Sequence, residues 1–180
     1  GCGTGLAGTY LKPLVSDAMI GVDASQKMLD IAAKCTTRKG CGLKESQVID
    51  DGVKEVPLYD DLLVLDLEEM TLKNTLANVK SRDVVGFDLI VAADVLVYFG
   101  SLSNLLQTFS QISTPGAGLI FSTELATTEE APLGWRLLPS GRFAHTKQHA
   151  TEAGSGAGYE LVSYREIVPR MERGEEVKGH

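Results

Sequence analysis

The sequence predicts an α/β fold with a doubly wound, mostly parallel sheet. Three observations predict it: apolar strand-like runs alternate with helical segments, acids stand at the ends of those runs, and a glycine-rich loop opens the chain. Such alternation is typical of parallel sheets, because each crossover between parallel strands usually contains a helix. The 180 residues are enough for one domain of this kind, so we expect a single domain over residues 1–180.

Four apolar segments are expected to be strands, and each ends at or near an acid. They are "DAMIGVD" ending at Asp23, "DLLVLDL" ending at Asp66, "FDLIVAADVLVYF" with Asp94, and "GLIFSTE" ending at Glu124. The third is nearly all apolar from Leu89 to Ala93, which is typical of an interior strand covered on both faces. Ligands of open α/β sheets lie beyond the carboxyl ends of the strands, so these acids and the glycines are expected at one edge.

The segments between these strands are expected to be helices or loops. Helical spacing is found in "LAGTYLKPL", in "SQKMLDIAAKC" with Ser25 as N-cap, in residues 68–80, and in "SLSNLLQTFSQIS" before "TPGAG". Residues 36–57 are expected to form a loop, and residues 125–145 a long loop over the substrate side. "YELVSYREIVPRME" alternates as an antiparallel edge strand does.

Composition limits the kinds of partner that the protein is expected to bind. The net charge is −7, which disfavours nucleic acid because a phosphate-binding surface needs positive charge. No segment is long and apolar enough to suggest a membrane span, and no signal peptide is recognisable. The three cysteines lack CxxC spacing, which speaks against a zinc ribbon, and a cytoplasmic location is the default expectation.

The glycines alone leave two kinds of cofactor open. Gly3, Gly5 and Gly8 satisfy the GxGxxG fingerprint of dinucleotide-binding proteins, while Gly1, Gly3 and Gly5 equally satisfy GxGxG. An NAD(P)-dependent oxidoreductase and a transferase with a nucleoside cofactor would both use Asp23 to accept hydrogen bonds from ribose hydroxyls. A third alternative is a degenerate, non-catalytic Rossmann-like domain that binds a partner. The sequence contains no YxxxK pair of the kind that an oxidoreductase would need.

Five motifs in order resemble the class I S-adenosylmethionine-dependent methyltransferases (EC 2.1.1). They are "GCGTG", "IGVDAS", "LVLDLEE", "FDLIVAADVLVYF" and "PGAGLIFSTE". Together with "LYDDL" and "LPSGRFAHT", they are closest to a subgroup of predicted methyltransferases often found with tetratricopeptide repeats. The resemblance implies a Rossmann-like fold and S-adenosylmethionine as cofactor. It also suggests that tetratricopeptide repeats could lie upstream in the full-length protein.

The resemblance also implies the cofactor contacts. Three glycines of the loop should let the backbone approach the methionyl part, Asp23 should bind the ribose hydroxyls, and Asp66 should accept from the adenine amine. The positions that match the family's cofactor contacts are Gly1, Cys2, Gly3, Gly5, Asp23, Ala24, Met28, Asp66, Leu67, Ala93 and Asp94. No metal is expected.

The acceptor side is expected after the later strands. Methyl transfer is a direct displacement, so the protein must mainly align the reactants and accept a proton where the acceptor carries one. The candidates are Tyr98, Glu124, Arg142 and His145, with His145 as the candidate base. The alternative is that Thr146 caps a following helix, Arg142 pairs locally and His145 only packs. The sequence lacks (N/D)PP(Y/F), so the expected acceptor is a small molecule or a protein side chain.

The resemblance is incomplete at both ends of the chain. No strand precedes Gly1, and only the first strand of the family's terminal antiparallel hairpin is recognisable. We therefore expect a fragment of a longer gene product that lacks the first and last strands of the sheet.

Overall fold

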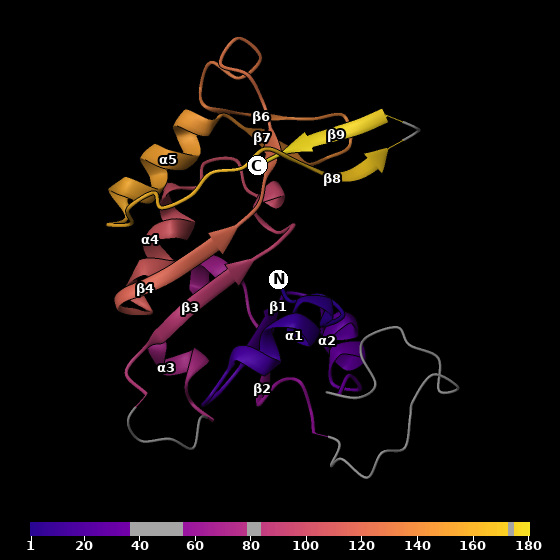
Figure 1. The fold of residues 1–180 in the computed structure, drawn as a ribbon, viewed down its shortest axis with the longest axis vertical. Coiled ribbons are helices and arrows are strands. Elements are labelled where there is room, and N and C mark those ends of the chain that lie inside the picture. The colour runs from indigo at the N-terminus through magenta and orange to yellow at the C-terminus, as the bar shows by residue number, and fades with distance from the viewer. Residues whose placement is uncertain (37–55, 79–83, 173–174) are drawn as a thin grey trace. The chain divides into compact units, whose positions relative to one another are not determined.

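The computed structural model describes residues 1–36, 56–78, 84–172 and 175–180. It divides into two compact units, Gly1–Val85 and Gly86–His180, where the sequence suggests one domain. Figure 1 shows the helices and strands of both units.

The first unit is built on a pair of parallel strands. β1 (Ile20–Asp23) pairs with β2 (Asp61–Val64), in register from Ile20 opposite Asp61 to Asp23 opposite Val64. The parallel pairing agrees with the sequence prediction. The other elements of this unit are α1 (Leu6–Leu11), η1 (Lys12–Leu14), α2 (Gln26–Ala32), η3 (Leu67–Glu69) and α3 (Leu72–Thr75).

Local sequence explains how these elements begin. The Ser25 hydroxyl accepts a hydrogen bond from the Met28 amide, so the predicted N-cap of α2 is confirmed. A capping box at Thr71 and Asn74 starts α3. The helix expected over residues 68–80 is reduced to η3 and the single turn of α3, because Met70 is extended. Most of the loop expected over 36–57 lies outside the described residues.

A small apolar core packs behind β1. Met19, Cys35 and Leu58 are buried there, with Leu11 and Tyr59 against them. Cys35 is disulfide-bonded, which the spacing of the cysteines does not predict.

The second unit begins with another parallel pair. β3 (Phe87–Ala92) pairs with β4 (Ser113–Phe121), and α4 (Ser103–Gln111) connects them after η4 (Leu96–Tyr98). The register jumps between the Phe87–Ser113 and Leu89–Gly118 pairs, because the predicted "TPGAG" turn forms a bulge inside β4, with Gly116 at φ 81°. Leu89 is 45% exposed, so β3 is less covered than its apolar sequence suggests.

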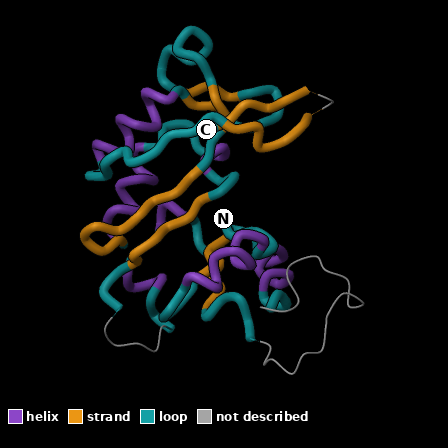
Figure 2. The backbone as a smooth tube through the Cα atoms, in the orientation of Figure 1, coloured by secondary structure: helices purple, strands orange, loops and turns teal. Residues whose placement is uncertain are grey.

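A mixed five-stranded sheet completes the second unit, in the order β6-β7-β5-β9-β8. β5 runs parallel to β7, and the other pairs are antiparallel. The helix α5 (Lys147–Gly156) follows β7 and lies beside α4 (Figure 1; Figure 2). The strands are β5 (Glu124–Leu125), β6 (Trp135–Leu137), β7 (Phe143–His145), β8 (Ile167–Glu172) and β9 (Glu175–Gly179).

Several expectations from the sequence change. A second strand of the terminal hairpin is present, because β9 pairs antiparallel with β8. β8 is an edge strand as predicted, but it starts only at Ile167. Residues 125–145 are not a structureless loop, since they contain β6, β7 and the end of β5. The described strands also form three sheets rather than one doubly wound sheet.

No helix among the described residues is long and apolar enough to cross a membrane. The core of the second unit includes five apolar side chains of η4 and α4 that are almost fully buried. They are Leu96, Val97, Leu105, Leu106 and Phe109.

Candidate functional site

The glycine loop and the end of β1 form the first part of the site. One carboxylate oxygen of Asp23 accepts from the Gly3 amide at 2.9 Å, and the other accepts from the Ser25 amide at 2.9 Å. The Cys2 amide donates to the Val22 carbonyl at 2.7 Å, which ties the loop to β1. Two backbone amides therefore fix Asp23, and each of its oxygens still has a lone pair for a further donor. This donor set fits a vicinal diol such as that of a ribose.

The glycines of the loop are required for different reasons. Gly3 has φ 55° and Gly5 has φ 91°, a left-handed conformation that strains other residues. A Cβ on Gly3 would meet no atom within 4 Å. Gly8 is needed for packing instead, because a Cβ there would lie 2.6 Å from Tyr59 Oη. Burial at this contact raises the pKa of Tyr59 to about 12.

The remaining predicted cofactor residues of this unit lie after β1, after β2 and at the start of the chain. Asp66 accepts from the Glu68 amide at 3.0 Å and caps η3, while Leu67 beside it is buried. Met28 is 43% exposed on the first turn of α2. Ala24 and Gly1 are also exposed, and burial raises the pKa of the Cys2 thiol. Contacts of these residues with a cofactor stay predictions.

In the second unit, Arg142 connects three of the predicted residues. Its Nε donates to Glu124 Oε1 at 2.6 Å, and its Nη2 donates to the Asp94 carboxylate. Its guanidinium carbon lies 5.4 Å from the centre of the Tyr98 ring, a cation–π contact. The structure thus gathers Asp94, Tyr98, Glu124 and Arg142, which we call the Arg142 cluster.

The members of the Arg142 cluster differ in exposure. The Glu124 side chain is 4% exposed and that of Arg142 is 15% exposed, while that of Asp94 is 62% exposed. Asp94 has φ 56°, and it is the one non-glycine residue with positive φ in the described part of the chain. Its amide donates to Ser122 Oγ at 2.9 Å, so Ser122 and Arg142 hold this strained residue. The cluster presents Asp94 and Tyr98 to solvent above a buried ion pair.

His145 is bonded to none of the side chains of the Arg142 cluster and is buried in the core. It is 0% exposed, its Nδ1 is hydrogen-bonded to Thr123 Oγ1, and its Nε2 lies 2.9 Å from the Phe99 and Gly100 carbonyl oxygens. A ring that is buried and bonded at both nitrogens cannot reach an acceptor molecule in this conformation. The geometry therefore disfavours His145 as the base and favours the packing alternative.

The segment after His145 also follows the alternative interpretation. Thr146 caps α5 by accepting from the His149 amide at 3.1 Å, and Arg142 is paired. The rings of His145 and His149 stack with centroids 5.9 Å apart. No group of three or more His, Cys, Asp or Glu side chains suited to a metal is found among the described residues.

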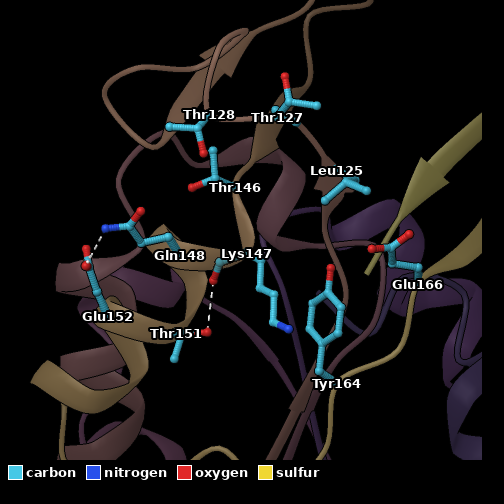
Figure 3. A pocket seen from close by; sticks show the side chains of 11 residues that line it. Leu125, Thr127, Thr128, Thr146, Lys147, Gln148, Thr151, Glu152, Tyr164 and Glu166 are labelled. Atoms are coloured by element: carbon cyan, nitrogen blue, oxygen red, sulfur yellow. Dashed lines mark hydrogen bonds between the residues drawn. The ribbon is translucent and has the colours of Figure 1, made fainter.

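A separate open cavity of about 690 Å³ lies in the second unit (Figure 3). It is lined by Leu125 of β5 and by the start of α5, where the Lys147 ammonium lies 4.1 Å from the centre of the Tyr164 ring. Successive residues of a strand face opposite sides, so Leu125 and Glu124 point away from each other. None of the four residues of the Arg142 cluster lines the cavity.

Ser122 and Thr123 are contacts that the sequence analysis did not find. They follow β4, and their hydroxyls contact Asp94 and His145. The available signal was their place in "FSTE", between a predicted strand and Glu124.

The fold is that of S-adenosylmethionine-dependent methyltransferases. The chain matches a structure of one from Mesorhizobium loti with 20% identity and TM-score 0.58, covering 94% of this chain and 76% of that one. Magnesium protoporphyrin IX methyltransferase from Synechocystis PCC 6803, solved with bound SAH, matches with 16% identity and TM-score 0.61 over 99% of this chain and 69% of that one. The [4+2]-cyclase SpnF matches with 20% identity and TM-score 0.64, covering 94% and 53%.

The family follows from the sequence match. Residues 1–170 match the model of the methyltransferase domain family, so the chain belongs to that family. No curated protein matches the chain. The comparisons give no support to the oxidoreductase or to the non-catalytic alternative.

Proposed function

We propose that this chain is the S-adenosylmethionine-binding domain of an enzyme that transfers a methyl group to a small molecule or a protein side chain. The observation that carries the proposal is the fixed carboxylate of Asp23 beside the left-handed glycines of the opening loop. The family match and the fold support the same cofactor.

The first unit supplies the proposed cofactor contacts. Asp23 would accept hydrogen bonds from both ribose hydroxyls, because Gly3 and Ser25 already hold its oxygens in place. The bare Cα of Gly3 leaves room for the methionyl part, since nothing lies within 4 Å of its Cβ position. Asp66 is proposed to accept from the adenine amine with its second oxygen, as Oδ1 already caps η3.

The second unit supplies the proposed acceptor contacts. Bound S-adenosylmethionine carries the methyl group on a sulfonium, so the bond from methyl carbon to sulfur breaks as the bond to the acceptor forms. Asp94 and Tyr98 are the exposed members of the Arg142 cluster, and we propose that they hold the acceptor. Glu124 and Arg142, which form a 2.6 Å ion pair, would orient the Asp94 and Tyr98 side chains from the buried side of the cluster. Ala93, directly before Asp94, remains a predicted cofactor contact.

Titration calorimetry with S-adenosylhomocysteine tests the cofactor site. We expect wild-type full-length protein to bind, and Asp23→Ala to bind on the order of 100-fold more weakly, because two charge-assisted hydrogen bonds are lost. Asp23→Asn keeps one acceptor oxygen and should fall between the two.

Asp17→Ala is the matched control, since Asp17 is an exposed acid that precedes β1. It should bind like the wild type. Absence of binding by the wild type, or equal weakening in Asp17→Ala and Asp23→Ala, would rule out the proposed site. NADH in the same experiment tests the oxidoreductase alternative, and tighter binding of NADH would reverse the ranking.

A further inference from the structure

Two histidines hold one short segment of the second unit, residues 98–102. His145 Nε2 lies 2.9 Å from the carbonyl oxygens of Phe99 and Gly100, and His149 Nε2 lies 3.1 Å from the Leu102 nitrogen. Together the two rings bond three backbone groups of a segment that begins with Tyr98.

The bonding partners determine the tautomer of each ring. Carbonyl oxygens only accept, so the proton of His145 is on Nε2, and Nδ1 accepts from the Thr123 hydroxyl. A backbone amide only donates, so His149 Nε2 carries a lone pair and its proton is on Nδ1. If Nε2 of His149 were also protonated, two hydrogen-bond donors, this Nε2–H and the Leu102 N–H, would face each other.

The segment also fits tightly against its surroundings. A Cβ on Gly100 would lie 3.0 Å from the Trp135 ring, and a Cβ on Gly134 would lie 2.7 Å from His149 Cβ. Leu102 is 0% exposed, so water cannot replace His149 as the partner of its amide. The Tyr98 and Phe99 amides bond the preceding turn, but the partners of the Phe99 and Gly100 carbonyls and of the Leu102 amide are the two rings.

We propose that His145 and His149 are positioning residues, which hold segment 98–102 and with it Tyr98, and that protonation of His149 releases the segment. The link to methyl transfer rests on the proposed function, because it requires Tyr98 to be on the acceptor side. The two rings touch no acceptor themselves, and they act through the backbone that carries Tyr98.

Burial of the two rings, together with the charged groups around them, places the response below pH 6.5. Burial lowers the pKa of His145, while the Phe99 and Gly100 carbonyls and Glu124 raise it and His149 lowers it. Burial lowers the pKa of His149, opposed only by Glu152 of the same helix.

The sign of the pH dependence follows from these lowered values. Both rings are neutral in the folded state at pH 7. Because the folded pKa lies below the unfolded value of 6.5, the stability that the neutral rings contribute is complete above pH 6.5. It is lost as the pH falls from 6.5 through the folded pKa.

Amide hydrogen exchange at Leu102 is the direct test in the full-length protein. The protection factor of this amide should fall about tenfold or more between pH 7.5 and a pH below the folded pKa of His149, read from the ring's own ¹⁵N titration, because a buried donor loses its acceptor. Trp135 is the only tryptophan of the chain, so its fluorescence should report the same transition.

Long-range ¹H–¹⁵N spectra at pH 7.5 should show His145 protonated at Nε2 and His149 at Nδ1. The opposite tautomers would overturn the proposal without any variant.

Three variants separate positioning from a merely structural role. His149→Gln offers a carbonyl oxygen that does not titrate, so protection of Leu102 should persist at both pH values. His149→Leu offers no acceptor and should lose protection at both. His180→Asn removes the third histidine and should keep the wild-type transition. A wild-type protection factor that stays unchanged while the His149 ring becomes protonated, or a wild-type pH response in His149→Gln, would contradict the proposal.

The two proposals can fail separately. If the wild type binds no S-adenosylhomocysteine, the proposed function fails, while the Leu102 and Trp135 measurements still decide on the histidines. If S-adenosylhomocysteine binds normally and the protection factor of the Leu102 amide does not change with pH, only the proposed positioning role is ruled out. Urea unfolding at both pH values shows whether any change is local or global.

Discussion

Asp23 and Asp94 both follow a parallel strand, but the protein holds them in different ways. Asp23 is bound by two backbone amides, from residues 20 and 2 positions away. Asp94 is in a left-handed conformation and is bound by Ser122 and Arg142, 28 and 48 positions away. The carboxylate of the first acid is held by backbone amides, whereas that of the second is paired with a cation.

This difference shows how the two units prepare their sites. In the first unit a loop and the start of a helix are enough, because backbone amides are present at every residue. In the second unit the arrangement depends on one guanidinium that must reach β3 and β5 at once. We therefore expect a substitution at Arg142 to be more damaging than one at any single residue of the glycine loop.

The largest effect is expected from Arg142→Met. It leaves the Glu124 carboxylate, 4% exposed, without its cation, and removing one partner of a buried ion pair costs about 3 kcal/mol or more. Urea unfolding of the full-length protein measures the loss.

Arg136→Met is the matched control, because the pair between Arg136 and Glu130 is 42% and 44% exposed. It should cost less than about 1 kcal/mol. Similar losses in both variants would show that burial of Glu124 does not decide the stability of the Arg142 cluster.

The next largest effect is expected from Gly8→Ala in the first unit. Its Cβ would lie 2.6 Å from Tyr59 Oη, and forcing a methyl group into a packed contact costs about 2 kcal/mol. The double variant Gly8→Ala, Tyr59→Ala removes the clash, so in a double-mutant cycle the cost of Gly8→Ala should vanish when Tyr59 is already alanine. An undiminished cost would mean that Tyr59 is not what requires a glycine.

A smaller effect distinguishes strain from charge at Asp94. Asp94→Ala loses the Arg142 contact but keeps a Cβ at φ 56°, a conformation that strains residues with a Cβ. Asp94→Gly loses the same contact, but a glycine adopts this φ without strain. We expect Asp94→Ala to be less stable than Asp94→Gly by about 1 kcal/mol. Equal thermal stabilities would argue against stored backbone strain at this position.

The smallest effect is expected at Asp60. Burial opposes ionisation there, but hydrogen bonds from Lys12 and the Met19 amide lower the pKa of Asp60 overall. The resulting stability is present above pH 3.8 and is lost as the pH falls through the lowered pKa. Lys12→Ala should cost about 0.5 kcal/mol at pH 7, since Asp60 is 46% exposed, and nothing at pH 2. A pH-independent loss would place the effect of Lys12 in packing.

The sequence was most informative where the contacts are local. The end of β1 at Asp23, the Ser25 cap and the Thr146 cap all follow from a few adjacent residues. It was least informative where strands of two or three residues pair over long distances. β9 was missed because "RGEEVKGH" has little strand propensity, and it becomes a strand by pairing with β8 and β5.

The sequence by itself determined the class of fold, the family motifs and the acid that ends β1, because strand periodicity, capping and glycine conformation act over short stretches of chain. Only the tertiary structure decided the contacts and the burial of the predicted site residues that follow β3. It joined Asp94, Tyr98, Glu124 and Arg142 in one cluster and buried His145 with both ring nitrogens bonded. The physical reason is that the charge and protonation state of a side chain depend on neighbours that are tens of residues away, and only folding brings these together.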